Sequence, residues 1–496
     1  MKFKSTRGGS EVLTFEEAVL RGYAPDGGMI VPATIPCIER GTLRQWAARN
    51  LTFPQLCEEI FALFIDEEEM PRADLRALLQ SCFGEFTDDE IVPIKHLAPR
   101  HATEAGSGFE FDVAELFHGP TLAFKDLGLQ FIGHMFEYLV RKRQRKLSII
   151  VATSGDTGSA AIHCVKGRQN MNIFVLLPGQ GRIAELQERQ MTTVLDKNVF
   201  SIAVDGTSDD ADVAVKGVFA DPEFVEKYGV CTINSPNWAR IMMQLVHFFY
   251  AYLRVCPECD REIVFSIPSG GFGNGFSGYL TKRMGLPVKY FIPAVNDNDT
   301  LHRFFAHGEL APSDVVVKTI SPAMDINVPY NIERLLYYLS GENAEKVREW
   351  MTHLEQSPNG KVKFDEELMA KARALYRSAS ATQQEVKAGI EFSHRIYDYV
   401  FCPHTAIAFL AAQKAHQQGE EAPIVVAATA HPAKFVDTVE EVLRKVNADY
   451  SLPVPPQLAG IRERETRCLQ WARPADWADV WTRDLQSLVT LSYQSG

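Results

Sequence analysis

One lysine lies in the surroundings that amine chemistry requires. Lys125 belongs to the segment ELFHGPTLAFKD, residues 115–126, and follows an apolar stretch at the point where a helix is expected to begin. A lysine that loses solvation in such a place has a lowered pKa, and its neutral amine can form a Schiff base with a carbonyl compound. The residues alone leave open a second interpretation, in which the aliphatic stem covers apolar surface and the charge reaches solvent.

Two glycine-rich turns, each between a predicted strand and a predicted helix, have the composition of anion-binding loops. The first is TSGDTG, residues 153–158, and the second is PSGGFGNG, residues 268–275. Glycine lets the backbone approach an anion closely, and the first N–H groups of a helix attract negative charge. Either turn could also be purely structural. Together with a Schiff-base lysine, they suit a cofactor that carries an aldehyde and a phosphate, which describes pyridoxal 5'-phosphate (PLP).

The second turn also supports a competing interpretation. Residues 273–278, GNGFSG, match the G-x-G-x-x-G pattern of dinucleotide-binding loops, and Asp297 follows at about the distance of a ribose-binding acid. Against a dinucleotide, the turn lies in mid-chain and a second anion-binding loop is already present. The loop also begins three residues early, with Ser269, Gly270 and Gly271, which favours a single phosphate monoester.

The elements that must position these residues follow an alternating pattern from about residue 109 onward. Short apolar runs alternate with helical patterns, as is typical of parallel βαβ units, so we predict an α/β fold. The predicted strands are 147–153, 172–178, 199–206, 230–234, 262–268, 288–296 and 422–430. Residues 297–420 are expected to be mostly helical. Near the N-terminus, Thr14 and Glu17 form a capping-box pattern, and helical patterns follow at 43–49, 53–65 and 72–82.

The composition is that of an ordinary globular protein. The chain has 496 residues, 46% of them hydrophobic and 23% charged, which is enough apolar material for more than one core. Its net charge of −12 argues against a nucleic-acid or anionic-membrane partner.

Several features lead us to expect a cytoplasmic protein. The first residues lack the apolar core of a secretory signal, and no apolar stretch reaches membrane-spanning length. Nine cysteines are sparse for a disulfide framework. Cys256 and Cys259 form a lone CxxC, for which a plain loop is favoured over zinc or redox chemistry, and no metal is expected.

Six motifs together resemble one enzyme family. In order along the chain they are GYAPDGGMIVP, ELFHGPTLAFKD, TSGDTG, NSPNWAR, AMDINVPYN and TAHPAKF. The chain resembles the threonine synthases over nearly its whole length, in the long form of bacteria and fungi, and is also similar to the vertebrate threonine synthase-like proteins. The resemblance implies the PLP-dependent fold type II (tryptophan synthase β-like), with two doubly wound α/β domains and a mainly helical N-terminal domain. The expected boundaries are 1–95 for the N-terminal domain, 146–259 for the small domain, and 96–145 with 260–496 for the large PLP-binding domain.

The resemblance also implies the roles of individual residues. Lys125 would carry PLP as a Schiff base, the glycine loop would surround its phosphate, and Thr429 would hydrogen-bond its pyridine nitrogen. The residues implied to hold the cofactor are therefore Lys125, Gly270, Gly271, Phe272, Gly273, Asn274 and Thr429. The residues implied to bind the substrate are Ser154, Asp156, Thr157, Asn234, Ser235, Asn237 and Arg240, with Arg240 a candidate for its phosphate. Thr6 and Arg7 are expected to reach the same cleft.

The implied reaction converts O-phospho-L-homoserine and water into L-threonine and phosphate. It would run through a PLP external aldimine, β,γ-elimination of phosphate and addition of water at Cβ, in a monomer or homodimer. One alternative is a PLP-dependent phospho-lyase that gives 2-oxobutyrate, phosphate and ammonia from the same substrate. Another is a PLP fold kept only for binding. The chain departs from the family at Gly271, where asparagine is common, whereas Thr429, His431 and Pro432 match true synthases.

Overall fold

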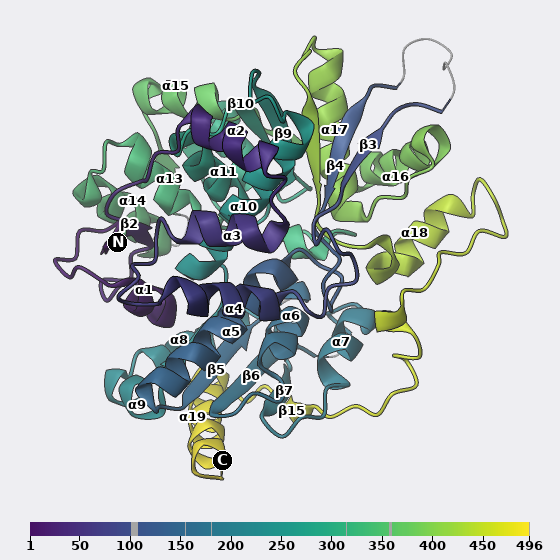
Figure 1. Ribbon diagram of the computed structural model, residues 1–496. Coiled ribbons are helices and arrows are strands. Elements are labelled where there is room, and N and C mark those ends of the chain that lie inside the picture. The colour runs from purple at the N-terminus through teal and green to yellow at the C-terminus, as the bar shows by residue number, and fades with distance from the viewer. Residues whose placement is uncertain (101–107, 154, 180, 314, 357–359, 496) are drawn as a thin grey trace.

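Two sheets organise the chain in the computed structural model, which describes residues 1–100, 108–153, 155–179, 181–313, 315–356 and 360–495 (Figure 1). The six strands of the larger sheet lie in the order β13 (Ala379–Ser380), β10 (Val288–Val295), β9 (Ile263–Pro268), β14 (Ile424–Ala428), β4 (Phe111–Glu115) and β3 (Ile94–Leu97). Neighbours are parallel except β3, which runs antiparallel to β4. The smaller sheet is parallel, in the order β15 (Leu469–Trp471), β7 (Val199–Val204), β6 (Met171–Pro178), β5 (Leu147–Ala152) and β8 (Val230–Cys231).

The helices between these strands confirm the predicted alternation. The runs that were predicted as strands are buried on both faces because helices cover them, as parallel sheets require. Two of the helices, α6 and α11, begin at the two glycine turns. The helices of this part are α5 (Lys125–Arg143), α6 (Asp156–Val165), α7 (Glu185–Thr192), α8 (Ser208–Phe219), α9 (Pro222–Tyr228), α10 (Trp238–Val255) and α11 (Gly273–Arg283).

The stretch from 297 to 420 is mostly helical, as predicted, within its described residues. Helix α17 packs against β9, β10 and β14, so it covers one face of the larger sheet. Strand β11 (Glu309–Leu310), which contacts α12, pairs antiparallel with β12 (Val362–Lys363), which contacts α14. The helices of the stretch are α12 (Thr300–His307), α13 (Ile332–Leu339), α14 (Ala344–Gln356), α15 (Glu366–Leu375), α16 (Gln383–Tyr397) and α17 (Pro403–Gln417).

The N-terminal region is mainly helical, but its core continues into the rest of the molecule. Strand β1 (Phe3–Ser5) pairs with β2 (Ile30–Pro32), and the predicted capping box at Thr14 opens α1 (Phe15–Arg21). Helices α2 (Arg40–Ala48), α3 (Phe53–Phe61) and α4 (Arg72–Cys82) follow. The Phe61 ring lies 4.7 Å from that of Phe131 on α5, and the Phe53 ring 5.4 Å from that of Tyr250 on α10. The region therefore packs on α5 and α10 within one shared hydrophobic core.

Helix α10 is long and strongly apolar. Its residues Trp238 to Leu253 are all buried, between the N-terminal helices, α5 and α11. Its apolar character is thus explained by a position inside the protein. In the described part of the chain, no helix combines the length and apolarity needed to cross a membrane.

The C-terminal segment differs from the predicted domain boundary. Strand β15 pairs with β7, and α19 (Trp477–Ser495) packs on α8 and α9, so both elements belong to the smaller sheet (Figure 1). Before them, η2 (Pro432–Phe435), α18 (Val436–Leu443) and η3 (Pro456–Leu458) follow β14. The prediction that 260–496 all belongs to the large domain is therefore wrong at its end. The three-residue strand LQW carries too short a pattern for the sequence to reveal this return.

Replacement of Trp481 by alanine tests the packing of α19. Trp481 is fully buried, and its indole N–H donates to the Ala472 carbonyl at 2.8 Å. Loss of a buried tryptophan side chain costs about 3–5 kcal/mol, so the denaturant midpoint followed by circular dichroism should fall markedly. Leu491→Ala on the same helix is the control, because Leu491 is 64% exposed and surface changes stay within about 0.5 kcal/mol. Equal midpoints for the two variants would contradict the position of α19.

Candidate active site

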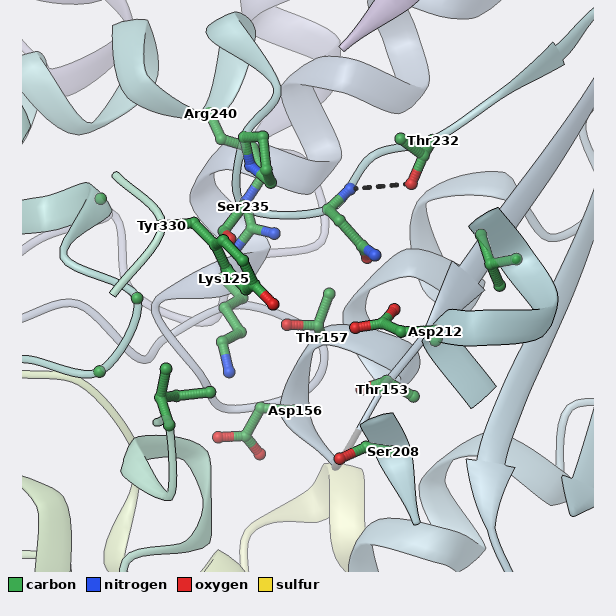
Figure 2. Close-up of a pocket in the computed structure, with 18 of the residues that line it drawn as sticks. Lys125, Thr153, Asp156, Thr157, Ser208, Asp212, Thr232, Ser235, Arg240 and Tyr330 are labelled. Atoms are coloured by element: carbon green, nitrogen blue, oxygen red, sulfur yellow. Dashed lines mark hydrogen bonds between the residues drawn. The ribbon is translucent and has the colours of Figure 1, made fainter. Parts of the chain in front are cut away.

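A cavity of about 2100 Å³ lies where strands of both sheets end. Its wall includes residues that follow β5, β6, β7, β9 and β14, so the carboxyl ends of two sheets face one space. This is the edge at which α/β proteins commonly bind ligands. Lys125, Arg240, Thr429 and both glycine turns contribute to the wall, as the sequence predicts. Figure 2 shows Lys125, Asp156, Thr157, Ser235 and Arg240 around the same space.

Lys125 is the first residue of α5, and its side chain extends into the cavity toward Asp156 (Figure 2). The preceding residue fixes its place, because the Phe124 N–H donates to the Thr429 carbonyl at 2.8 Å at the end of β14. Burial lowers the pKa of Lys125 to about 8, against the opposing effect of the Asp156 carboxylate. The positive charges of Arg240 and Lys434 contribute smaller parts of this lowering of the Lys125 pKa. An amine with this pKa is partly neutral near physiological pH and can attack a carbonyl.

The second glycine turn forms a cradle at the N-terminus of α11. Residues 268–274 line the cavity, and the first N–H groups of α11 have no acceptor within the helix. Gly270 is tightly packed, since a Cβ there would lie 3.1 Å from the Ala323 carbonyl oxygen and from Ile326 Cγ1, and 3.2 Å from the Cα of Met324. Gly271 has more room, because its Cβ would meet only the Ser235 hydroxyl, at 3.6 Å.

Phe272 contributes backbone to this cradle and places its ring elsewhere. It caps α11 with a left-handed backbone, φ 61°. Its ring packs against those of Tyr376 and Phe305, at 5.4 and 5.9 Å between centroids. The ring is therefore part of the core and does not stack on a ligand in the cavity.

Asn274 carries an unpaired donor at the same turn. Its Oδ1 lies 3.0 Å from Nε2 of the buried His247, so the imidazole N–H donates to the amide oxygen. The buried Asn274 Nδ2 has no partner among the described residues. Buried donors in proteins are nearly always satisfied, so this amide, together with the N–H groups of α11, suits an anion such as the phosphate of PLP. The residues present thus fit the cofactor that the sequence predicts.

Asp156 begins α6 at the first glycine turn and is a buried carboxylate. Its Oδ1 lies 3.0 Å from Lys434 Nζ and 3.1 Å from Gln187 Nε2. Burial alone would raise the pKa of Asp156, but the charges of Lys434 and Lys125 hold it well below its ordinary value. Thr157 lines the cavity beside it, whereas Ser154 lies outside the described residues. The turn therefore presents an ionised carboxylate to the amine of Lys125.

Arg240 supplies a buried cation on the opposite wall. It lies on α10, and burial lowers the pKa of its guanidinium to about 10. One of its amino groups donates to the Ile233 carbonyl at 3.3 Å, and no described carboxylate acts on its charge. Asn234 and Ser235 line the cavity next to it. This wall can therefore receive an anionic group of a ligand.

Asn237 does not line the cavity, contrary to the prediction that it faces the substrate. Its Oδ1 accepts from the Ala239 N–H at 3.0 Å and caps α10. Its Nδ2 donates to the carbonyls of Val19 at 2.7 Å and Thr232 at 3.2 Å. The side chain is therefore used in joining α10 to the N-terminal helix, and we withdraw Asn237 from the candidate binding residues.

The structure also places Thr6 and Arg7, which were expected to reach the cleft, and Asp297, which was considered as a ribose-binding acid. Arg7 reaches the cavity wall, but its guanidinium is already paired with Glu333 at 2.8 Å and Glu355 at 2.6 Å. Thr6 donates to the same Glu333. Asp297 is exposed and does not line the cavity, so the acid that a dinucleotide ribose would need is not at this site.

The cavity includes residues that the sequence analysis did not single out. Lys434 belongs to the quoted motif TAHPAKF, yet only the tertiary fold shows that it is fully buried beside Asp156. Tyr330 belongs to AMDINVPYN and lines the same cavity, as does Asp212 (Figure 2). Among the described residues, no group of three or more His, Cys, Asp or Glu side chains is arranged to hold a metal ion.

Three family models match consecutive parts of the chain. The model described as "Threonine synthase N terminus" matches residues 2–83, "Pyridoxal-phosphate dependent enzyme" matches residues 97–430, and "Threonine synthase, C-terminal" matches residues 405–482. The second of these covers more than half of the chain.

Curated relatives and solved structures agree with these matches. The chain is 36% identical over 489 residues to threonine synthase-like 2 of Xenopus laevis, covering 98% of this chain and 99% of the relative. It is 38% identical over 494 residues to threonine synthase of Eremothecium gossypii, covering 94% of each. The crystal structure of yeast threonine synthase superposes with a TM-score of 0.90 at 34% identity, covering 100% of this chain and 99% of that one. A PLP-bound threonine synthase from Brucella melitensis gives 0.86 at 36% identity, covering 98% and 99%.

Alanine at position 270 tests the cradle. Its Cβ would press on the backbone of Ala323 and Met324, and overpacking of this kind costs about 1–3 kcal/mol. Gly270→Ala should therefore weaken PLP binding, measured by titrating the protein with PLP and following visible absorbance. Gly271→Ala is the matched control, because a Cβ there meets only a hydroxyl at ordinary contact distance. Equal affinities for the two variants would contradict this cradle as the phosphate site.

Proposed function

The chain belongs to the threonine synthase family of PLP-dependent enzymes, and on that basis we propose that its cavity converts O-phospho-L-homoserine and water into L-threonine and phosphate. The observation that carries this proposal is the placement of Lys125 in one cavity with a glycine cradle and with Arg240, a buried cation without a carboxylate partner among the described residues. The cradle and Arg240 give separate places for two phosphate groups, the first for that of a cofactor and the second for that of a substrate.

The residues proposed to hold the cofactor surround Lys125. The amine of Lys125 would bind its aldehyde, the cradle at 270–274 its phosphate, and the Thr429 hydroxyl its ring nitrogen. When bound, PLP supplies an electron sink for negative charge that develops on the substrate. A hydroxyl at the ring nitrogen cannot protonate it as a carboxylic acid would, so the charges around the ring must help to direct the reaction.

Lys125 is also the proposed proton carrier. With a pKa near 8, its Nζ is poised to accept the proton from Cα of the substrate once that substrate is bound, and to return it later. Asp156 and Arg240 face the same amine, so its proton affinity is balanced between a carboxylate and a guanidinium.

Arg240 is the proposed ligand of the substrate phosphate, with Asn234 and Ser235 beside it. A departing phosphate needs cations and N–H donors directed at its oxygens. The buried guanidinium has lost much of its solvation, which strengthens its attraction for an anion in the cavity. Thr157 and the N-terminus of α6 are proposed for the substrate carboxylate, since the dipole of a helix favours an anion there.

We further propose a cytoplasmic enzyme that acts as a monomer or homodimer. The support for the location is the sparse cysteine content, since the cysteines of the described chain are free thiols and most are buried.

A product assay tests the proposed function. With PLP and O-phospho-L-homoserine, the protein should release phosphate and threonine in equal amounts, measured in the same sample. Lys125→Ala should lose both the visible absorbance of bound PLP and the turnover, because it lacks the amine. Phosphate together with 2-oxobutyrate and no threonine would overturn the synthase assignment, as would a sample that releases no phosphate.

Replacement of Arg240 by alanine tests its assignment to the substrate. A charge-assisted hydrogen bond contributes about 1.5–3 kcal/mol, so KM for O-phospho-L-homoserine should rise at least roughly tenfold. PLP affinity should change little, because the cradle is intact. Arg254→Ala on the same helix is the control, since Arg254 contacts Tyr250 and the Leu51 carbonyl outside the cavity. Equal losses of substrate and cofactor binding in Arg240→Ala would remove this role.

A further inference from the structure

Lys434 is a buried cation to which neither the family motifs nor the proposed reaction assigns a task. It lies in η2, directly after β14, and its side chain is 0% exposed. Its ammonium group has three N–H donors and three acceptors: the Thr121 carbonyl at 2.7 Å, Gln190 Oε1 at 2.9 Å and Asp156 Oδ1 at 3.0 Å. A lysine is buried to this extent only when its charge is paired and its donors are satisfied.

The three acceptors come from different parts of the fold. Asp156 begins α6 and Gln190 lies on α7, and both helices accompany the smaller sheet, whereas Lys434 follows a strand of the larger sheet. Thr121 precedes Lys125 by four residues and also binds the Asp126 carboxylate. Lys434 thus joins the two sheets at the wall of the cavity, next to the turn that leads into α5.

We propose that Lys434 is a positioning residue that holds the Asp156 carboxylate facing the amine of Lys125 and balances the charge around that amine. The inference rests on the proposed function only in that Lys125 is taken as the residue that binds the cofactor. It adds a role for a cation that does not itself contact the reacting atoms.

The charged and titratable groups around Lys125 can be named from each element that faces it. They are Asp156 on α6, Arg240 on α10, Lys434 in η2 and His404 on α17. Burial lowers the pKa of His404 to about 4, so this imidazole is neutral at physiological pH. Asp156 is consequently the one carboxylate among these four groups, and two cations flank the amine.

This arrangement predicts opposite effects for the two partners of the ion pair. Without the Lys434 charge, the amine of Lys125 loses a repulsive neighbour, and its pKa should rise above the value near 8 of the intact site. Without the Asp156 charge, the amine loses its attractive neighbour and the pKa should fall. Removing both charges together should return the pKa toward its original value.

The experiment measures the rate at which the full-length protein, freed of cofactor, forms its visible absorbance band with added PLP at a series of pH values. Only the neutral amine attacks the aldehyde, so the midpoint of this pH profile reports the protonation of Lys125. The variants are Lys434→Met, Asp156→Asn, the double variant and Lys434→Arg, which keeps the charge. Lys289→Met is the matched control, because Lys289 pairs with the buried Glu420 at 2.7 Å outside the cavity.

We expect the midpoint to rise by roughly one pH unit in Lys434→Met and to fall by a similar amount in Asp156→Asn. The double variant should lie between the two, and Lys434→Arg and Lys289→Met should match the unmodified protein. An unmoved midpoint in Lys434→Met, or shifts of both single variants in one direction, would overturn the proposal, because a purely structural lysine gives no opposing shifts.

Two features keep the test decisive. If Lys434→Met does not fold because it leaves Asp156 without this partner, the double variant, which removes both charges of the pair, is compared with Asp156→Asn alone. A double-variant midpoint above that of Asp156→Asn supports the proposal, and a midpoint equal to it overturns the proposal. The measurement is also independent of the product assay: a protein that shows these shifts but makes no threonine contradicts the proposed reaction alone. A visible band that persists in Lys125→Ala overturns both.

Discussion

The burial of one amine beside one carboxylate is the constraint on which this site depends. Desolvation lowers the pKa of Lys125 to about 8, and Asp156 opposes that effect from the N-terminus of α6. The two groups belong to elements that start at the ends of different sheets, so their separation is set by how the sheets are held together. Lys125 and Lys434 act on this carboxylate, and Arg240 is a third buried cation that acts on the amine. A cavity with more cations than carboxylates favours ligands with phosphate groups, as a PLP-dependent enzyme with a phosphorylated substrate requires.

The N-terminal region supports the same cavity from another side. Glu333 on α13 is fully buried and accepts hydrogen bonds from Arg7 and from the Met29 N–H, so β1 and β2 are attached to that helix. The next residue, Arg334, donates to the Ile30 carbonyl at 3.0 Å and to the Pro236 carbonyl at 2.6 Å. Because Pro236 lies between Ser235 and the cap of α10, this chain of buried charges connects the first strand of the protein to the proposed substrate wall. A buried carboxylate is tolerated only with such partners, which ties the N-terminal region to the site energetically.

Local signals in the sequence predicted the elements and the two turns, while tertiary contacts decided the rest. The apolar runs at 147–153 and 262–268, the capping box at Thr14 and the glycine turns all depend on neighbouring residues, and each appears where expected. Asn237 was misassigned because its partner Val19 is distant in sequence. Lys434 was missed because a lysine near an apolar stretch is usually exposed, and only three acceptors from three segments explain its burial. The position of the C-terminal segment at the smaller sheet was likewise missed, because β15, which pairs with β7, is too short to show a strand pattern in the sequence.

The glycine at position 271 leaves the proposed cradle without a side chain at that position. A Cβ there would have ordinary contact with Ser235 alone, whereas a Cβ at position 270 would press on its neighbours at 3.1–3.2 Å. The donors of the cradle are then the backbone N–H groups at the start of α11 and the amide of Asn274, which His247 holds from behind. On the other side of the cavity, the bond between the Phe124 N–H and the Thr429 carbonyl fixes Lys125 relative to Thr429. In the proposed site, the orientation of the cofactor would therefore depend on these backbone groups and on the Asn274 amide, none of which belongs to the side chain at position 271.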